Sequence, residues 1–159
     1  MTGLAWALGT FHATVVGLAL LLLAYPGGGL GVTLGGLSTV TGLALFVALW
    51  ATTVCATGRA FAGLDLVTDG TAVRGFYRRA LRWGGANGVL FLWSFAAILA
   101  LQQAVTAPGT LSLQTLLLGA GFVVGIGSLF AFTFGAVIGL GLASIDLVAL
   151  ALARAIARG

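Results

Sequence analysis

The sequence predicts an all-α fold, a polytopic membrane helix bundle with four transmembrane helices and a basic interfacial amphipathic helix. The 159 residues are 60% hydrophobic and only 6% charged, whereas soluble domains carry about 25% charged residues. The runs 1–58 and 83–145 contain no Asp, Glu, Lys or Arg. Proline and glycine divide these runs into segments near the roughly 20 residues that cross a bilayer. We therefore expect residues 1–159 to form a single integral membrane domain.

The first uncharged run is expected to hold two spans. Pro26 is followed directly by three glycines, a combination that favours a turn. A turn here leaves one apolar segment at about 4–24 and a second at about 32–57. Both are long enough to cross a bilayer as helices.

The segment "TAVRGFYRRALRW", residues 71–83, is expected to form the interfacial helix. On a helix its apolar residues form one face, namely Val73, Phe76, Tyr77, Ala80 and Leu81. Four of the seven arginines in the chain lie on another face: Arg74, Arg78, Arg79 and Arg82. Such a helix places its apolar side among acyl chains and its guanidinium groups near anionic headgroups. These arginines are thus predicted to anchor the protein at the membrane interface.

The remaining apolar sequence predicts one or two further spans after a third at about 86–105. Pro108 and Gly109 follow that third span, but residues 113–153 are too long for one crossing and contain no polar turn. A break at 125–128 or near Gly135 would give five spans, with Arg154 and Arg158 opposite the other arginines. Four spans keep every arginine on one side, which we expect to be cytoplasmic together with both termini.

A short similarity suggests an internal repeat. "AGLDLV" at 62–67 resembles "ASIDLV" at 143–148, and a Pro-Gly turn precedes each at nearly the same distance. The match predicts a candidate two-fold repeat of 1–82 and 83–159, an arrangement that some transporters use. Coincidence in a chain rich in Ala, Gly, Leu and Val is the alternative interpretation.

His12 is the one ionisable group in the first expected span, where we place it near the bilayer midplane. Ionisable groups inside a membrane are costly, and they therefore suggest a functional site. A transport path would pass His12 and the hydroxyls of the second span, with Ser38, Thr41 and Thr52 as its other candidates. Alternatively, a neutral imidazole bonds to a neighbouring helix as a packing contact. An intramembrane carboxylate is not expected unless Asp146 is carried inward.

Glycine is abundant, with 26 copies, and several copies lie four residues apart. Small residues at this spacing let membrane helices approach closely. The predicted packing positions are Gly31, Gly35, Gly121, Gly125, Gly135 and Gly139. They serve either contacts within the chain or an oligomer interface.

The motifs of catalysis and cofactor binding are incomplete in this sequence. Cys55 is the sole cysteine, and no lysine is available for a phosphate-binding loop. "DGTAVR", residues 69–74, resembles part of the CDP-alcohol phosphatidyltransferase motif. However, Leu66, Asn87 and Phe91 stand where that motif requires metal-binding aspartates, so two metal ions would lack their ligands. We expect no enzyme activity, no cofactor, no metal and no nucleic-acid partner.

The function expected from these observations is that of a small multi-pass protein of the cell membrane without catalytic machinery. It would be a structural or accessory subunit of a membrane complex, or a homo-oligomer. The alternative is a small channel or transporter with a path near His12. The expected partners are anionic lipids and other membrane protein chains. Abundant Arg, Ala and Gly without Lys suggest a prokaryotic source.

Overall fold

The computed structural model describes residues 3–25, 38–62, 70–107 and 112–158. Of these residues 96% are helical, and none of them lies in a strand. The elements in chain order are α1 (Gly3–Ala24), α3 (Thr39–Phe61), α4 (Gly70–Thr106), α5 (Leu113–Phe122), the π-helical turn η1 (Val123–Gly127) and α6 (Ser128–Arg158). The all-helical fold predicted from the sequence is confirmed.

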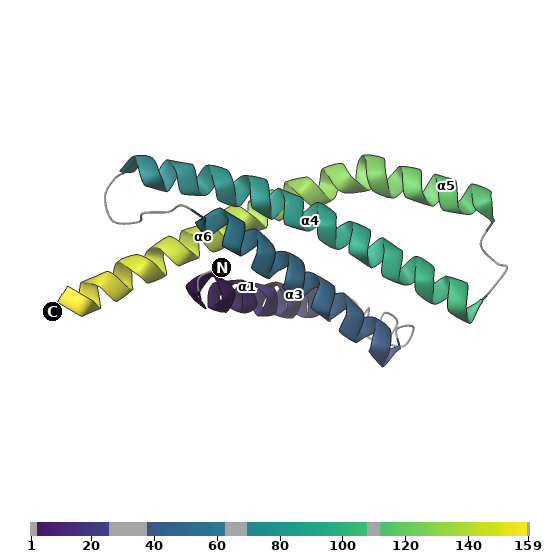
Figure 1. The fold of residues 1–159 in the computed structure, drawn as a ribbon, viewed down its shortest axis with the longest axis horizontal. Helices are drawn as coiled ribbons and strands as arrows, with labels where there is room; N and C mark the ends of the chain where they lie inside the picture. Colours follow the sequence, from purple (N-terminus) through teal and green to yellow (C-terminus); the bar gives the residue numbers. More distant parts are fainter. Residues whose placement is uncertain (1–2, 26–37, 63–69, 108–111, 159) are drawn as a thin grey trace.

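Four helical segments are long and apolar enough to cross a membrane: 3–22, 39–61, 73–106 and 114–157. They alternate in direction along the chain (Figure 1). The fourth comprises α5, η1 and α6, which follow one another without a reversal of the chain. The described structure therefore agrees with four candidate spans rather than five.

The glycines that suggested a fifth span instead form the π-helical turn η1. Ser128 Oγ donates a hydrogen bond to the carbonyl oxygen of Val123 at 2.9 Å, and Trp93 Nε1 donates to Ser128 Oγ at 3.0 Å. A π turn widens the helix locally and can bend it, but it does not reverse the chain. The predicted break at 125–128 thus marks an irregular turn within a continuous helix.

The predicted interfacial helix and the predicted third span belong to one helix, α4. Residues 71–83 are helical as expected, but they continue without interruption into the apolar sequence to Thr106. Phe76 is 1% exposed, and Ala80 is also buried, in a cluster with Ala60 of α3 and Ala143 of α6. The expectation that this whole apolar face meets acyl chains is therefore wrong, because the centre of the face packs against the protein.

The helices pack in the order α1, α3, α4, α6, each against the next. Gly9 allows the close approach of α1 to α3, since a Cβ at Gly9 would lie 2.7 Å from Cα of Val54. α1 and α6 do not pack along their lengths within the described residues. The bundle is thus a row of helices rather than a closed ring.

Glycines also make the contact between α4 and α6. Gly84 and Gly88 of α4 face Gly135 and Gly139 of α6, and a Cβ at Gly84 would lie 2.6 Å from the carbonyl oxygen of Gly135. Both helices thus carry two glycines one turn apart, which brings their backbones together. The predicted packing role of Gly135 and Gly139 agrees with these contacts within the chain.

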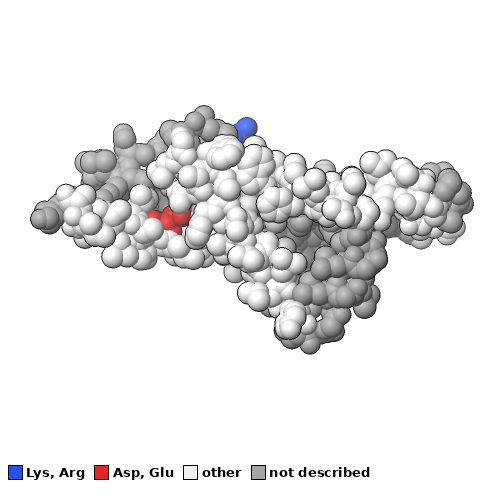
Figure 2. All heavy atoms as spheres, turned by 90° about the horizontal axis from the view of Figure 1, so that it is seen from below, with Lys and Arg blue, Asp and Glu red and all other residues white. Residues whose placement is uncertain are grey.

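Two of the other predicted glycine positions, Gly121 and Gly125, do not contact another part of the described chain. A Cβ at Gly121 or Gly125 would meet open space, while Gly31 and Gly35 lie outside the described residues. α5 projects away from α4 (Figure 1), and the side chains of Leu117, Leu118 and Phe122 are exposed. Among the described residues of the face shown in Figure 2, almost none carries a charge. An apolar surface of this extent requires lipid or further protein around it.

Candidate functional site

The candidate site is built around a hydrogen bond between His12 of α1 and Asp146 of α6. His12 Nε2 lies 3.0 Å from Asp146 Oδ1. The two residues are 4% and 3% exposed, respectively. Burying either group without a partner is expensive, and each satisfies the other here. The sequence predicts a carboxylate inside the bundle only if Asp146 faces inward, and Asp146 does face inward.

Thr57 of α3 completes the contacts of the imidazole. Its Oγ1 lies 3.3 Å from His12 Nδ1, and Thr57 is itself buried. With the imidazole neutral, Nε2–H donates to the carboxylate and Nδ1 accepts from the Thr57 hydroxyl. The imidazole thus links α1, α3 and α6 at a single point.

The His12–Asp146 pair lies nearer one end of the bundle than the position of His12 in α1 suggested. Thr57 is only two residues from Arg59 and four from the end of α3 at Phe61, a distance of about 6 Å along the helix. This end of α3 lies beside the arginine-bearing start of α4. The site is therefore close to the end of the bundle that carries the arginines.

A cavity of about 830 Å³ lies between the four long helices, and His12 and Asp146 line it. This volume lies within the range of about 300–1,000 Å³ that small-molecule sites occupy. The other polar side chains in its wall are Thr53, Thr57 and Asn87, apart from the indole of Trp83. Most of the remaining wall is formed by Leu, Phe, Ala and Gly. The cavity suits a largely apolar molecule with a small polar part.

Asn87 and Thr53 form a second polar contact in the wall. Asn87 Nδ2 donates to Thr53 Oγ1 at 3.2 Å. Asn87 Oδ1 is buried and has no hydrogen-bond partner within the part of the chain that the structure describes. A buried acceptor without a partner is costly.

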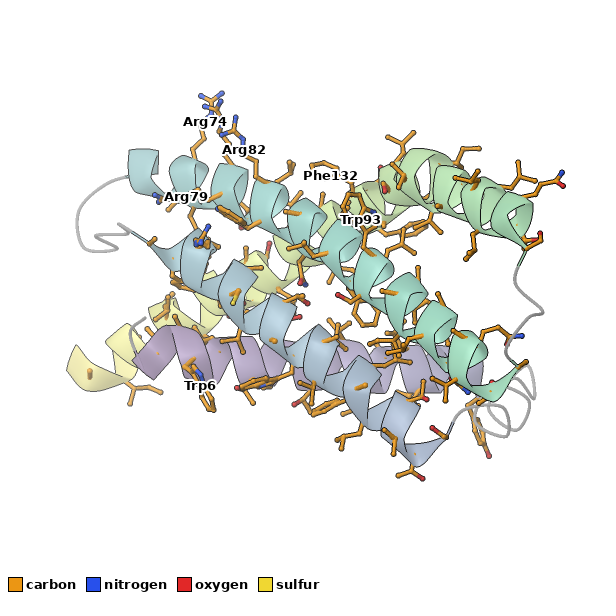
Figure 3. The ribbon with its side chains drawn as sticks, turned by 45° about the vertical axis from the view of Figure 1, so that its right-hand side comes forward. Trp6, Arg74, Arg79, Arg82, Trp93 and Phe132 are labelled. Atoms are coloured by element: carbon orange, nitrogen blue, oxygen red, sulfur yellow. The ribbon has the colours of Figure 1, made fainter. Side chains whose placement is uncertain are left out.

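Among the side chains that the structure describes, arginines lie near the polar end of the bundle, but none of them lines the cavity. The guanidinium carbon of Arg59 lies 5.0 Å from the ring centre of Trp83, which lines the cavity. Arg79 Nη1 donates to the carbonyl oxygen of Ala62 at 3.1 Å, whereas Arg74 and Arg82 point away from the bundle (Figure 3). Arg78 is exposed as well. Three of the four predicted anchor residues therefore remain free to meet an external partner.

The structure places only His12 of the predicted path residues in the cavity wall. Ser38 caps α3 and accepts a hydrogen bond from the amide of Thr41, and the hydroxyls of these two residues lie 2.8 Å apart. Thr52 Oγ1 donates to the carbonyl oxygen of Ala48 at 2.9 Å. These three hydroxyls of α3 thus bond within their own helix rather than forming a track with His12.

Sequence reasoning missed Asp146, Thr57 and Asn87 as site residues. Asp146 follows the buried Ala143 by three residues and precedes Arg154 by eight. A single carboxylate on the inner face of an apolar helix was the available signal. The equivalent Asp65 of the candidate repeat lies outside the described residues, so the structure does not test the pairing of the two motifs.

No cluster of three or more His, Cys, Asp or Glu that could hold a metal ion is found among the described residues. The model of a family described as "Family of unknown function (DUF7965)" matches residues 2–159. No curated protein and no solved structure matches the chain.

Proposed function

The chain belongs to this family of unknown function, DUF7965, and we propose that it is a multi-pass membrane protein that binds a lipophilic small molecule inside the bilayer. One observation carries the proposal: a cavity of about 830 Å³ has a buried His12–Asp146 pair in an otherwise mostly apolar wall. Ionisable groups within membrane helices are rare and commonly mark functional sites. A wholly structural bundle would favour packed apolar side chains in this space.

The wall also favours binding over a continuous hydrophilic path. Its polar side chains are those of His12, Thr53, Thr57, Asn87 and Asp146, apart from the indole of Trp83. Beyond Asn87 along α4, the lining residues are Gly88, Phe91, Leu92 and Phe95. A polar solute would find no side-chain hydrogen-bond partner along this part of the wall, which is costly. An apolar chain would instead pack against these residues.

We further propose that the arginine-bearing end faces the cytoplasm, with both termini on that side of the cell membrane. Basic residues that flank apolar spans favour the cytoplasmic side. Arg74, Arg78 and Arg82, which are exposed, would contact anionic headgroups there, each worth about 1 kcal/mol.

The test is saturable binding by the full chain in a nonionic detergent, measured by native mass spectrometry with 1-dodecanol and dodecane as probes. We expect one probe molecule per chain. Ala56→Phe should abolish binding because Ala56 lines the cavity. Cys55→Phe is the matched control on the same helix, since Cys55 is exposed and outside the cavity wall. Absence of a bound probe, or equal loss in both variants, would refute the proposal.

A transport path near His12 is a second candidate, favoured by the hydrogen bonds from Asp146 through His12 to Thr57. It predicts proton flux into liposomes that contain the protein and a pH-sensitive dye. His12→Ala should abolish that flux while circular dichroism stays unchanged. Flux that His12→Ala leaves intact would exclude a path through this residue.

A role as an accessory subunit or a homo-oligomer is favoured by α5. Gly121 and Gly125 face open space beside exposed leucines, so another chain could pack closely there. Cross-linking in native membranes through Gly121→Cys, in a Cys55→Ala background because Cys55 is exposed, should trap that neighbouring chain. A monomer as the sole product would argue against this role.

A further inference from the structure

The cavity is elongated, and the carboxylate of Asp146 lies at one end of it. On α6 the lining residues extend from Ala131 to Asp146, and these 15 residues correspond to about 22 Å along the helix axis. His12 lies at the same end, because it is hydrogen-bonded to Asp146 and is the first lining residue of α1. The other lining residues of α6 are all apolar. A ligand that fills this space needs a long apolar tail and a head that meets Asp146.

The apolar end is accessible from outside the bundle. Leu20, Leu21, Phe46 and Phe134 line this end, and all four side chains are exposed. α1 and α6 do not pack along their lengths within the described residues. A lipophilic molecule can therefore enter from the surrounding apolar phase without first crossing water.

Asp146 keeps one carboxylate oxygen for a donor from outside the chain. Oδ1 lies against His12 Nε2, whereas Oδ2 has no hydrogen-bond partner among the described residues. Oδ2 also keeps accessible surface, since the fully enclosed polar atoms without a partner belong to other residues. Because Asp146 lines the cavity, a ligand there can reach this oxygen. This holds for a neutral and for a protonated imidazole, since Nε2–H donates to Oδ1 in both.

The charge of the site is negative when the imidazole is neutral. No arginine side chain that the structure describes forms an ion pair with Asp146. Arg59 is exposed and lies over Trp83, and Arg79 donates to the carbonyl oxygen of Ala62. An ionised carboxylate in apolar surroundings is costly unless a cation pairs with it. The head that matches this site is therefore a cation that carries a hydrogen-bond donor.

We propose that the cavity binds a lipophilic primary amine in its ammonium form, with an N–H that donates to Asp146 Oδ2. Such charge-assisted hydrogen bonds are about twice as strong as neutral ones. The tail then extends along α6 past Leu142 and Ile138 to Phe134, 12 residues and about 18 Å from Asp146. This inference rests on the proposed binding function, because it specifies the ligand of the same cavity.

Four probes with one tail and different heads test this preference at pH 7: dodecylamine, dodecyltrimethylammonium, 1-dodecanol and dodecanoate. Native mass spectrometry of the full chain gives the affinity for each. We expect dodecylamine to bind about tenfold more tightly than 1-dodecanol, which corresponds to about 1.4 kcal/mol, and dodecanoate to bind most weakly. Dodecyltrimethylammonium has the charge but no N–H, so it should bind less tightly than dodecylamine.

The outcomes separate this inference from the proposed function. Dodecylamine that binds no more tightly than 1-dodecanol would overturn the amine preference and leave the binding function intact, because an imidazolium would then neutralise the carboxylate. Dodecyltrimethylammonium that binds as tightly as dodecylamine would overturn the hydrogen bond to Asp146. No binding of any probe would overturn both the inference and the proposed function.

Variants on α6 and α3 locate the two ends of the ligand. Asp146→Asn keeps the size of the side chain and an acceptor for His12 but removes the charge, so dodecylamine should fall to the affinity of 1-dodecanol, which should not change. Leu45→Phe fills the apolar end and should weaken dodecylamine but not hexylamine. Val47→Phe is its matched control, because Val47 is exposed and outside the cavity wall. An unchanged preference for dodecylamine in Asp146→Asn would overturn the proposal; the ranking of the four probes in the unchanged chain decides it if that variant does not fold.

Discussion

The crossing of α4 and α6 gives the sharpest stability prediction, through the variant Gly139→Ala. A Cβ at Gly139 would lie 2.7 Å from the carbonyl oxygen of Ala80 and 3.0 Å from Cα of Gly84. Ordinary van der Waals contact begins near 3.4 Å, so the helices must separate by about 0.7 Å at this point. Both opposing atoms belong to the backbone, and no rotamer change can relieve the overlap.

The cost of this separation follows from the physics of overpacking. Extra methyl groups in a well-packed interior destabilise proteins by about 1–3 kcal/mol. Gly141→Ala is a matched control on the same helix, because a Cβ there meets nothing within 4 Å. That variant gains helix propensity, up to about 1 kcal/mol. Gly139→Ala gains the same propensity, so we expect it to be less stable than Gly141→Ala by the overpacking cost, about 1–3 kcal/mol.

Unfolding in mixed micelles with increasing sodium dodecyl sulfate, followed by circular dichroism, measures this difference. Both proteins carry one added methyl group in one helix, so the intrinsic preference of Ala for helix cancels. Equal stability of the two variants would refute the close α4–α6 approach. A less stable Gly141→Ala would refute it as well, because open space at that position offers nothing to displace.

Two further predictions concern the polar pair and the orientation of the chain. In a double-mutant cycle of His12→Ala and Asp146→Ala, each single change should lower the free energy of unfolding by about 3 kcal/mol, because it leaves the other group buried alone. The double variant should lose less than the sum of the two by about 0.5–3 kcal/mol, and strict additivity would refute the pairing. In a Cys55→Ala background, a membrane-impermeant maleimide should reach Arg78→Cys and Thr106→Cys from opposite sides of the membrane. The 28 residues between them extend about 42 Å along α4, against a hydrocarbon core of about 30 Å, so reaction of both from one side would contradict a spanning α4.

The helical fold could be predicted from composition and from the Pro-Gly punctuation. Long uncharged runs leave few alternatives to apolar helices. The predicted spans agree with α1 and with the end of α4 to within a few residues, whereas α3 begins seven residues and ends four residues later than predicted. The predicted division before Ala86 is wrong, because α4 continues through it. Gly84 and Gly85 are poor helix formers in isolation, which made a break there plausible from the sequence. In the bundle, Gly84 lies against α6. Tertiary packing thus determines whether that glycine ends a helix or lets another helix approach closely.

The site could be predicted only in part, because it depends on which helix faces are brought together. The single histidine within an apolar segment identified His12. Its partner lies 134 residues away in the chain, beyond any spacing rule. Periodicity indicates that Asp146 shares a helix face with the buried Ala143, but not which helix that face meets. Among the hydroxyls of α3, Thr53 and Thr57 contact other helices, whereas Thr52 bonds to its own backbone.

The sizes of the packed residues explain why this bundle contains a cavity. Glycines hold α4 against α6, and Gly9 brings α1 close to α3. Between these two tight pairs, large residues such as Phe46 of α3 and Phe91 of α4 line the cavity. The pairs meet through α3 and α4, while α1 and α6 are linked at the polar end by His12 and Asp146. Breaking that link should therefore widen the cavity and leave both glycine contacts in place.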